Sequence, residues 1–269
     1  MNQILDSTRI VVCLGFLIYA SWSDYKTREV SNNVWIVFGP IAFLLTLAQF
    51  LFSPPTLIGG DIFQLLTYYG LSFTITSVFS IALFYVGAYG GADAKALMCV
   101  ALAMPLPPDL AEPLSGFVSL IFPITVFSNG VIIAALSVFY ALARNLHWRF
   151  RGNRKLFDGY ENVSLGRKIL ALLCGYKVSV AKLKESFLYP LEDFQMTKQG
   201  ESKRSLLIFP KDEDRDDVVE RIMKAKDEGK IEDSVWATPG LPMLIFITIG
   251  FILALTIGDI VWITISQLI

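Results

Sequence analysis

The sequence predicts an α-helical membrane protein with six transmembrane helices and a small cytoplasmic α/β domain inserted before the last helix. The chain has 269 residues, of which 54% are hydrophobic and only 17% charged, whereas soluble domains average about 25% charged residues. Its apolar residues gather in long runs, several of them near the length of about 20 residues that a transmembrane helix needs. Of the 23 lysines and arginines, 19 lie between Arg144 and Lys230. The charged residues are therefore concentrated in one polar segment.

Six apolar segments are predicted to cross the membrane: residues 10–24, 34–52, 62–88, 94–104, 117–142 and 242–268. The first is expected to be retained, because it ends in the polar stretch SWSDYKTREV rather than at a small-residue cleavage site. The fourth is short, since a dozen helical residues reach only about 18 Å of a hydrocarbon core about 30 Å thick. It could therefore be a re-entrant hairpin instead of a span.

The distribution of basic residues favours a fourth span. Lys26 and Arg28 follow the first segment, Lys95 follows the third, and the stretch ARNLHWRFRGNRK follows the fifth, whereas the two other linkers have no basic residue. Basic flanks lie on the cytoplasmic side of membranes, and all of them do so only if the fourth segment crosses. The chain is thus expected to be a multi-pass cell-membrane protein with both termini outside. Residues 1–145 carry helices one to five, 146–238 form the cytoplasmic domain, and 239–269 carry helix six.

The cytoplasmic segment has its own secondary-structure signals. The stretch SLGRKILALLCGYKVSVAKLKE predicts an amphipathic helix followed by a strand, and SLLIF predicts a short buried strand. In KDEDRDDVVERIMKAKDEGK, acidic residues open a helix, lysines close it and Gly229 ends it, as the helix dipole favours. These signals predict a small α/β domain.

Histidine and cysteine are too scarce for several kinds of site. The only histidine is His147, and the three cysteines, Cys13, Cys99 and Cys174, form no CxxC pair. This composition excludes a multi-histidine metal site and gives no support for a zinc ribbon or a disulfide framework. No metal, cofactor or nucleic-acid partner is expected.

Two aspartates are predicted to lie on the same side of the membrane. Asp24 ends the first segment, and Asp93 stands between the third and fourth, so two crossings separate them. An ionisable residue at mid-bilayer costs at least about 2.5–3.5 kcal/mol and is functional by default. Two neighbouring carboxylates can share one proton, so that one activates water while the other polarises a scissile carbonyl. Gly90 and Gly91, which lack Cβ atoms, would let the backbone bend or a substrate strand approach closely.

Each of these residues also has a structural interpretation. Asp24 could be an interfacial residue, and Asp93 could be the N-cap of the fourth helix. Lys95 could be a snorkelling anchor. Arg28 and Glu29 could pair with each other or bind charges of a substrate.

Two motifs resemble those of a known family. The stretch SDYKTREVSNNVW followed by GGADAKAL resembles the two catalytic motifs of the type IV prepilin peptidases, which are GxGD-type membrane aspartyl proteases. Three further stretches are similar to archaeal preflagellin peptidases in particular: FPITVFSNG, IFPKDED and WATPGLP. The resemblance implies that Asp24 and Asp93 are catalytic, with Gly90 as the first glycine of GxGD and Ala92 in place of the second. The paired CxxC motifs of bacterial relatives are absent, so zinc binding and N-methylation are not carried over.

The resemblance implies a membrane aspartic endopeptidase that removes the short basic leader of preflagellins (prearchaellins) or type IV prepilin-like precursors at the cytoplasmic face. Its expected partners are these precursors and membrane lipids. Gly90, Gly91, Ala92, Lys95 and Arg28 are expected to support the motif or bind substrate, and Glu29 to attract the basic leader. Three alternatives remain: a presenilin-like intramembrane protease, a small transporter with the two aspartates as a proton relay, and a scaffold of a filament or secretion machine.

Overall fold

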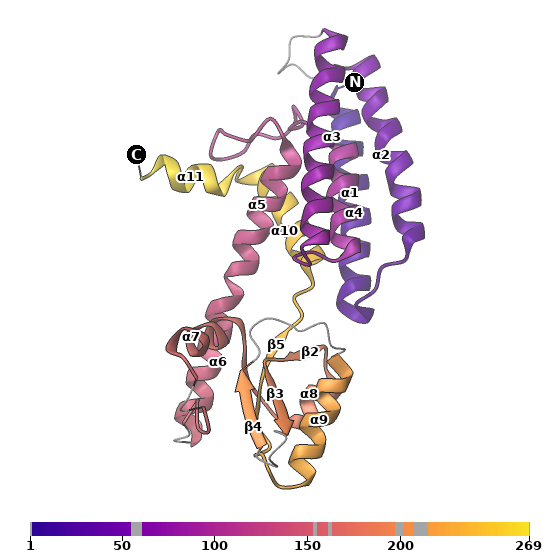
Figure 1. Ribbon diagram of the computed structural model, residues 1–269. Coiled ribbons are helices and arrows are strands. Elements are labelled where there is room, and N and C mark those ends of the chain that lie inside the picture. Colours follow the sequence, from indigo (N-terminus) through magenta and orange to yellow (C-terminus); the bar gives the residue numbers. More distant parts are fainter. Residues whose placement is uncertain are drawn as a thin grey trace. The chain divides into compact units, whose positions relative to one another are not determined.

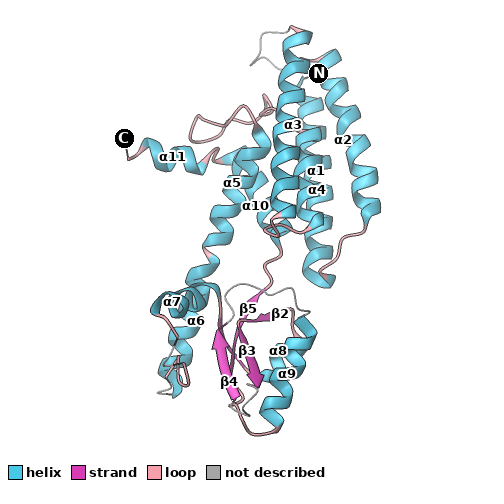
Figure 2. Cartoon of the chain, viewed as in Figure 1, coloured by secondary structure: helices cyan, strands magenta, loops and turns pink. Residues whose placement is uncertain are grey.

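The computed structural model describes residues 2–54, 61–152, 155–160, 163–196, 202–206 and 215–268 (Figure 1). The chain is mostly helical and divides into two compact units. One comprises Met1–Ala135 and Pro242–Ile269, and the other Leu136–Leu241. All described strands belong to the second unit (Figure 2).

The first unit is a bundle built around a short central helix. Its helices are α1 (Asn2–Thr27), α2 (Asn32–Phe52), α3 (Ile62–Tyr85), α4 (Gly91–Ala103), α5 (Phe122–Ala135), α10 (Met243–Thr256) and α11 (Ile260–Ser266). Helix α4 contacts α1, α2, α3, α5 and α10, and Ala96, Leu97 and Val100 are completely buried. A helix that is apolar on all sides belongs in a core. Helices α1, α2, α3, α5 and α10 therefore surround α4, whereas α11 extends away from it (Figure 1).

The described residues contain four helices long and apolar enough to cross a membrane: Gln3–Thr27, Asn32–Phe52, Ile62–Tyr85 and Phe122–Arg151. Helices α10 and α11 give a fifth if they count as one bent span. The six predicted spans are not reached, because α4 has only 13 residues, about 20 Å of helix. The chain therefore has four to five candidate membrane spans.

The predicted span over residues 242–268 is formed by two helices, with a break between them. Helices α10 and α11 meet at an angle of 58°, and Gly258 between them has a φ of 97°, a conformation that favours glycine. The Asn129 Nδ2 donates to the Gly258 carbonyl (2.8 Å), and its Oδ1 accepts from the Ile260 N–H (3.1 Å). Asp259 is the N-cap of α11. Polar contacts thus stabilise the break.

Two other predicted helix boundaries differ from the structure. Helix α5 begins at Phe122 rather than at residue 117, because the preceding segment bonds to the end of α10, with the Asp259 N–H donating to the Phe117 carbonyl (3.1 Å). Helix α3 ends at Tyr85 rather than at residue 88, since Gly87 adopts a φ of 76°. Both changes shorten the predicted spans.

The second unit is a small α/β structure. Its elements are α6 (Ser137–Gly152), α7 (Leu165–Cys174), β1 (Tyr176–Val178), α8 (Val180–Glu185), β2 (Leu188–Pro190), β3 (Glu192–Met196), β4 (Ser202–Leu206), α9 (Arg215–Asp227) and β5 (Val235–Pro239). Strand β5 pairs antiparallel with β1 and β2 on its two sides, and β3 pairs with β4. The unit begins before residue 146, because α6 packs against α7 and β1.

Several local predictions for this unit are confirmed. The amphipathic helix followed by a strand is α7 and β1, and the charge-ordered helix is α9, after which Gly229 has a φ of 68°. Trp236 on β5 is completely buried in a cluster with Tyr160 and Leu191. The predicted strand SLLIF is described only to Leu206, and the motif IFPKDED lies outside the described residues.

Candidate active site

Asp24 lies in the last turn of α1 and is half-buried. Cys13, Leu17 and Ala20 precede it at spacings of three or four residues, and each is 0% exposed. Residues at these spacings share one face of a helix. Asp24 therefore continues the face of α1 that packs into the core.

The turn after α1 holds the backbone near Asp24 in a fixed conformation. The Arg28 N–H donates to the Asp24 carbonyl (2.9 Å), and Arg28 has a φ of 59°, which is uncommon for a residue other than glycine. The charge of Arg28 acts on the Asp24 carboxylate. The hydroxyls of Ser23 and Thr27 donate to the Glu29 carbonyl at 2.8 and 3.0 Å. The Glu29 side chain itself is exposed.

Asp93 is buried at the start of α4, with 8% of its surface exposed. It is not the N-cap, as one interpretation had it. The N-cap is Gly90, whose N–H donates to the Asp93 Oδ2 (3.1 Å). A carboxylate in the first turn is also stabilised by the helix dipole. The aspartate thus closes the first turn of α4 with one of its oxygens.

The space available for a side chain differs among the three residues before Asp93. A Cβ atom at Gly90 would lie 3.1 Å from the Asp93 Oδ2, whereas one at Gly91 would meet only the Phe84 ring, at 3.6 Å. Ala92, which stands where the GxGD motif has its second glycine, packs against the core. Gly90 is therefore the position at which the carboxylate requires a small residue.

Lys95 joins α4 to the start of α2. Its Nζ donates to the Asn32 Oδ1 (2.7 Å). The side chain is half-buried. Its ammonium group thus bonds to a protein side chain, whereas a snorkelling lysine places this group in water. Lys95 thus fixes the first turn of α4 against α2.

Asp24 and Asp93 lie near enough for the charge of Asp24 to act on the Asp93 carboxyl, although burial and the Gly90 N–H act on that carboxyl more strongly. No hydrogen bond joins these two described side chains. Gly90 and Arg28 each act on one of the two carboxylates, through the contacts given above. Glu29 and Lys95 belong to the same segments, but in the described part of the chain neither side chain bonds to either carboxylate.

Tyr89 is a further residue of the site, which the sequence pattern did not predict. Its side chain is 9% exposed, its ring lies 5.6 Å from that of Phe127, and the Asp93 charge acts on it. In the part of the chain that the structure describes, its buried hydroxyl has no hydrogen-bond partner. Buried polar groups are nearly always bonded, so an exception requires an explanation. Its position directly before GGAD was a signal that could have found it.

The chemistry that this site offers is acid–base chemistry. Within the described ranges, no three His, Cys, Asp or Glu side chains lie close enough to hold a metal ion. The groups that do gather are two carboxylates and a tyrosine hydroxyl. Two carboxylates that interact can divide the roles of acid and base between them.

Comparisons with known proteins decide the family. The sequence pattern of the type IV leader peptidase family matches residues 11–140, and that of the archaeal peptidase A24 C-terminus type II matches residues 167–260. Together these matches support assignment of the chain to the type IV leader peptidase family. It is 28% identical to a preflagellin peptidase of Methanococcus voltae over 91% of this chain and 93% of the relative. It is 26% identical to one from Methanococcus maripaludis strain C6, over 93% and 94% of the two chains.

An uncharacterised protein of Methanocaldococcus jannaschii is also similar, with 24% identity over 89% of this chain and 91% of that protein. The two family patterns cover different parts of the chain. The first includes Asp24, Asp93 and Tyr89, and the second includes α7 to α10. The candidate site thus lies wholly within the leader peptidase pattern.

Proposed function

We propose that this chain is a membrane aspartic endopeptidase that removes the leader peptide of preflagellin or type IV prepilin-like precursors at the cytoplasmic face of the membrane. The observation that supports the proposal best is the electrostatically coupled pair Asp24 and Asp93, at the adjoining ends of α1 and α4. The family supplies the reaction, and the names of the Methanococcus relatives supply the precursor class.

The proposed reaction uses the two carboxylates as one acid–base unit. In catalysis they lie about 3 Å apart and share one proton. The ionised carboxylate takes a proton from water, whose oxygen attacks the scissile carbonyl carbon, while the protonated carboxyl donates to the carbonyl oxygen. The peptide C–N bond then breaks, and the leaving amine takes a proton from the unit. Because the sites are coupled, the apparent pKa values belong to the pair.

The local structure supports different roles for the two aspartates. Asp93 is held by the Gly90 N–H and surrounded by core residues, whereas Asp24 is half-buried beside Arg28. A desolvated carboxyl keeps its proton more readily, and a neighbouring guanidinium favours the ionised form. We therefore assign the protonated role to Asp93 and water activation to Asp24.

A leader-cleavage assay tests the function. Membranes that contain the wild-type chain are incubated with a tagged preflagellin, and the product is analysed by mass spectrometry. The expected product begins where the hydrophobic segment of the precursor begins. Unaltered precursor, or a cut within the hydrophobic segment as a presenilin-like protease would make, contradicts the proposal. Chelators and serine-directed reagents are expected to leave the rate unchanged.

Tyr89→Phe is expected to lower kcat about 10-fold or more and to leave KM within about twofold. Its hydroxyl lies near Asp93 without a partner, and one donor that stabilises a developing negative charge is worth about 10²-fold or more. Steady-state kinetics of leader cleavage measure both constants. The control is Tyr68→Phe, which removes the hydroxyl of an exposed tyrosine on α3. Equal effects of the two variants would contradict a role for Tyr89 in the reaction.

A further inference from the structure

A second pair of buried charges lies near the start of α1, in a different turn of the helix from Asp24. Asp6 is 1% exposed and Arg9 is 3% exposed, and the Arg9 Nη1 donates to the Asp6 Oδ1 (3.2 Å). Removing charges from water costs several kcal/mol per ion, which a buried pair recovers only in part. Neither residue contacts the dyad through a bond, so the reaction described above leaves this pair unexplained.

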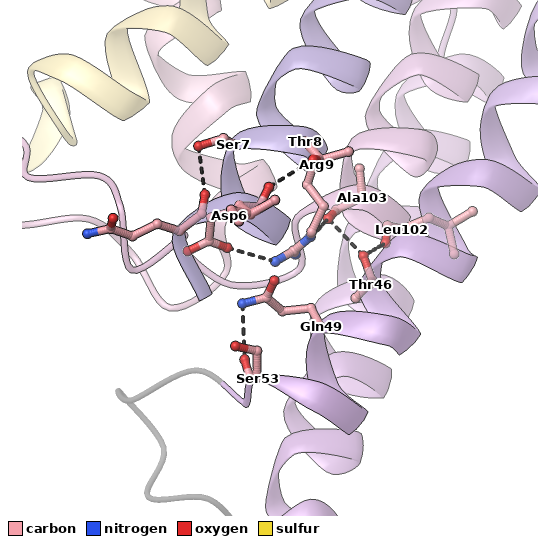
Figure 3. Close-up of polar contacts among 11 residues, drawn as sticks. Asp6, Ser7, Thr8, Arg9, Thr46, Gln49, Ser53, Leu102 and Ala103 are labelled. Atoms are coloured by element: carbon pink, nitrogen blue, oxygen red, sulfur yellow. Dashed lines mark hydrogen bonds and ion pairs between the residues drawn. The ribbon is translucent and has the colours of Figure 1, made fainter. Parts of the chain in front are cut away.

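The remaining donors of Arg9 bind the end of α4 (Figure 3). Its Nε and Nη2 donate to the Ala103 carbonyl at 3.0 and 2.7 Å. The Thr46 hydroxyl of α2 lies 2.8 Å from both the Leu102 and the Ala103 carbonyl oxygens. The last four carbonyls of a helix have no partner within it, and cations are favoured there. Arg9 and Thr46 therefore cap α4, and we call Asp6, Arg9 and Thr46 the α4 clamp.

The clamp is needed because α4 is short. A helix of 13 residues extends about 20 Å, so its last carbonyls lie among the other helices, and unsatisfied carbonyls in an apolar environment cost several kcal/mol each. The chain after α4 is held as well, since the Ser72 hydroxyl of α3 donates to the Pro105 carbonyl (2.6 Å). Helices α1, α2 and α3 thus all hold the C-terminal end of α4.

Helices α1 and α4, which Arg9 connects, also carry the two aspartates of the proposed dyad. Arg9 of α1 meets Ala103 of α4, and Cys13 of α1 and Cys99 of α4 belong to the same buried cluster. A step of four residues forward along α1, from Arg9 to Cys13, thus corresponds to a step of four residues back along α4, from Ala103 to Cys99. This is the pattern of two antiparallel helices. The clamp at the C-terminal end of α4 therefore fixes the axial position of α4 relative to α1. Asp93 lies at the N-terminal end of α4. A displacement of about 1 Å at a reacting group can cost about 10²-fold in rate.

We infer that Arg9 is a positioning residue, which sets the axial position of α4 along α1 and thereby the approach of Asp93 to Asp24. The effect on catalysis rests on the proposed function, whereas the effect on helix position does not. Loss of the clamp is expected to lower kcat at least about 10-fold, with KM within about twofold, because the leader would still bind. Arg9→Lys keeps the charge and one possible donor to Ala103, so it should recover part of kcat.

The experiment compares purified full-length Arg9→Met, Arg9→Lys and Thr46→Val with the wild type, at a temperature at which each is folded by circular dichroism. Thr46→Val is the milder variant, since it removes a single hydroxyl and keeps the volume, and it should lower kcat about threefold or more. The control is Thr248→Val, which removes the hydroxyl contact of α10 with Ser21 of α1 (2.7 Å), a hydroxyl whose hydrogen bonds go to α1 and α10 rather than to α4. Its kcat should stay within about twofold of the wild type.

Alkylation of two native cysteines gives a readout that does not depend on activity. Cys13 is 0% and Cys99 6% exposed, so a maleimide should label both slowly in the wild type and in Thr248→Val. In Arg9→Met, labelling of Cys99 measured by mass spectrometry should be at least about 10-fold faster, and Arg9→Lys should fall between. Wild-type labelling together with wild-type kcat in folded Arg9→Met and Thr46→Val would overturn the inference. If the wild type itself cleaves no precursor, the proposed function fails, and the labelling rates alone still decide the role of the clamp.

Discussion

Asp93→Asn is expected to reduce leader cleavage by about 10³-fold or more. The asparagine amide can neither share a proton with Asp24 nor donate one to the scissile carbonyl, and the loss of a catalytic acid–base group costs about 10²–10⁴-fold. The fold should survive, because an asparagine oxygen can still accept from the Gly90 N–H. Initial rates of product formation, measured by mass spectrometry with the purified protein, check the prediction.

Asp61→Asn is the matched control for that variant. Asp61 is the N-cap of α3, where its Oδ1 accepts from the Phe63 N–H (3.0 Å), and asparagine is as good an N-cap as aspartate. The same change of charge should therefore leave the rate within about twofold of the wild type. A comparable loss of activity in both variants would show that charge alone, and not the acid–base role of Asp93, accounts for the effect.

Gly250→Val is expected to destabilise the helical unit by about 3 kcal/mol or more. A Cβ atom at Gly250 would overlap the Val126 carbonyl oxygen and lie 2.7 Å from the Gly130 nitrogen, so α5 and α10 are in backbone contact there. Larger side chains at such crossings force the helices apart, and overpacking costs about 1–3 kcal/mol or more. The loss should appear as a lower midpoint of thermal or denaturant unfolding in detergent.

Gly15→Ala is the control for this change. No atom lies within 4 Å of a Cβ at Gly15, and alanine stabilises a helix relative to glycine by about 1 kcal/mol. The unfolding midpoint should therefore stay the same or rise. If Gly250→Val unfolds at the same midpoint as Gly15→Ala, the close contact of α5 and α10 is contradicted.

The sequence predicts that Asp24 and Asp93 lie on the same side of the membrane, because two expected helix crossings separate them, and in the structure the charge of Asp24 does act on the Asp93 carboxyl. The details of α4 were not predictable. Its N-cap is a glycine without a side chain, and its C-terminal carbonyls are capped by Arg9, which is 94 residues away in sequence. A single arginine before an apolar run resembles an ordinary flanking charge, so its burial cannot be read from local sequence.

The break between α10 and α11 was missed for a related reason. Residues 242–268 are mostly apolar, with Asp259 as their single charged residue, and glycine is common in membrane helices, so Gly258 does not predict a bend by itself. The bend depends on Asn129, which contacts Gly258 and Ile260 from another helix. In the second unit, α9 was predictable from its charge order, whereas β1 pairs with β5 about 60 residues later, a contact that local patterns do not encode.

The most direct test of the proposed dyad compares leader cleavage by the purified wild type, Asp24→Asn, Asp93→Asn and the double variant, all shown to be folded. Residues that act as one unit lose activity together, so either single change should be as damaging as both. We expect each single variant to fall at least about 10³-fold below the wild type, to the level of the double variant. Cleavage by either single variant at more than about a tenth of the wild-type rate would contradict an aspartyl pair at the centre of this site.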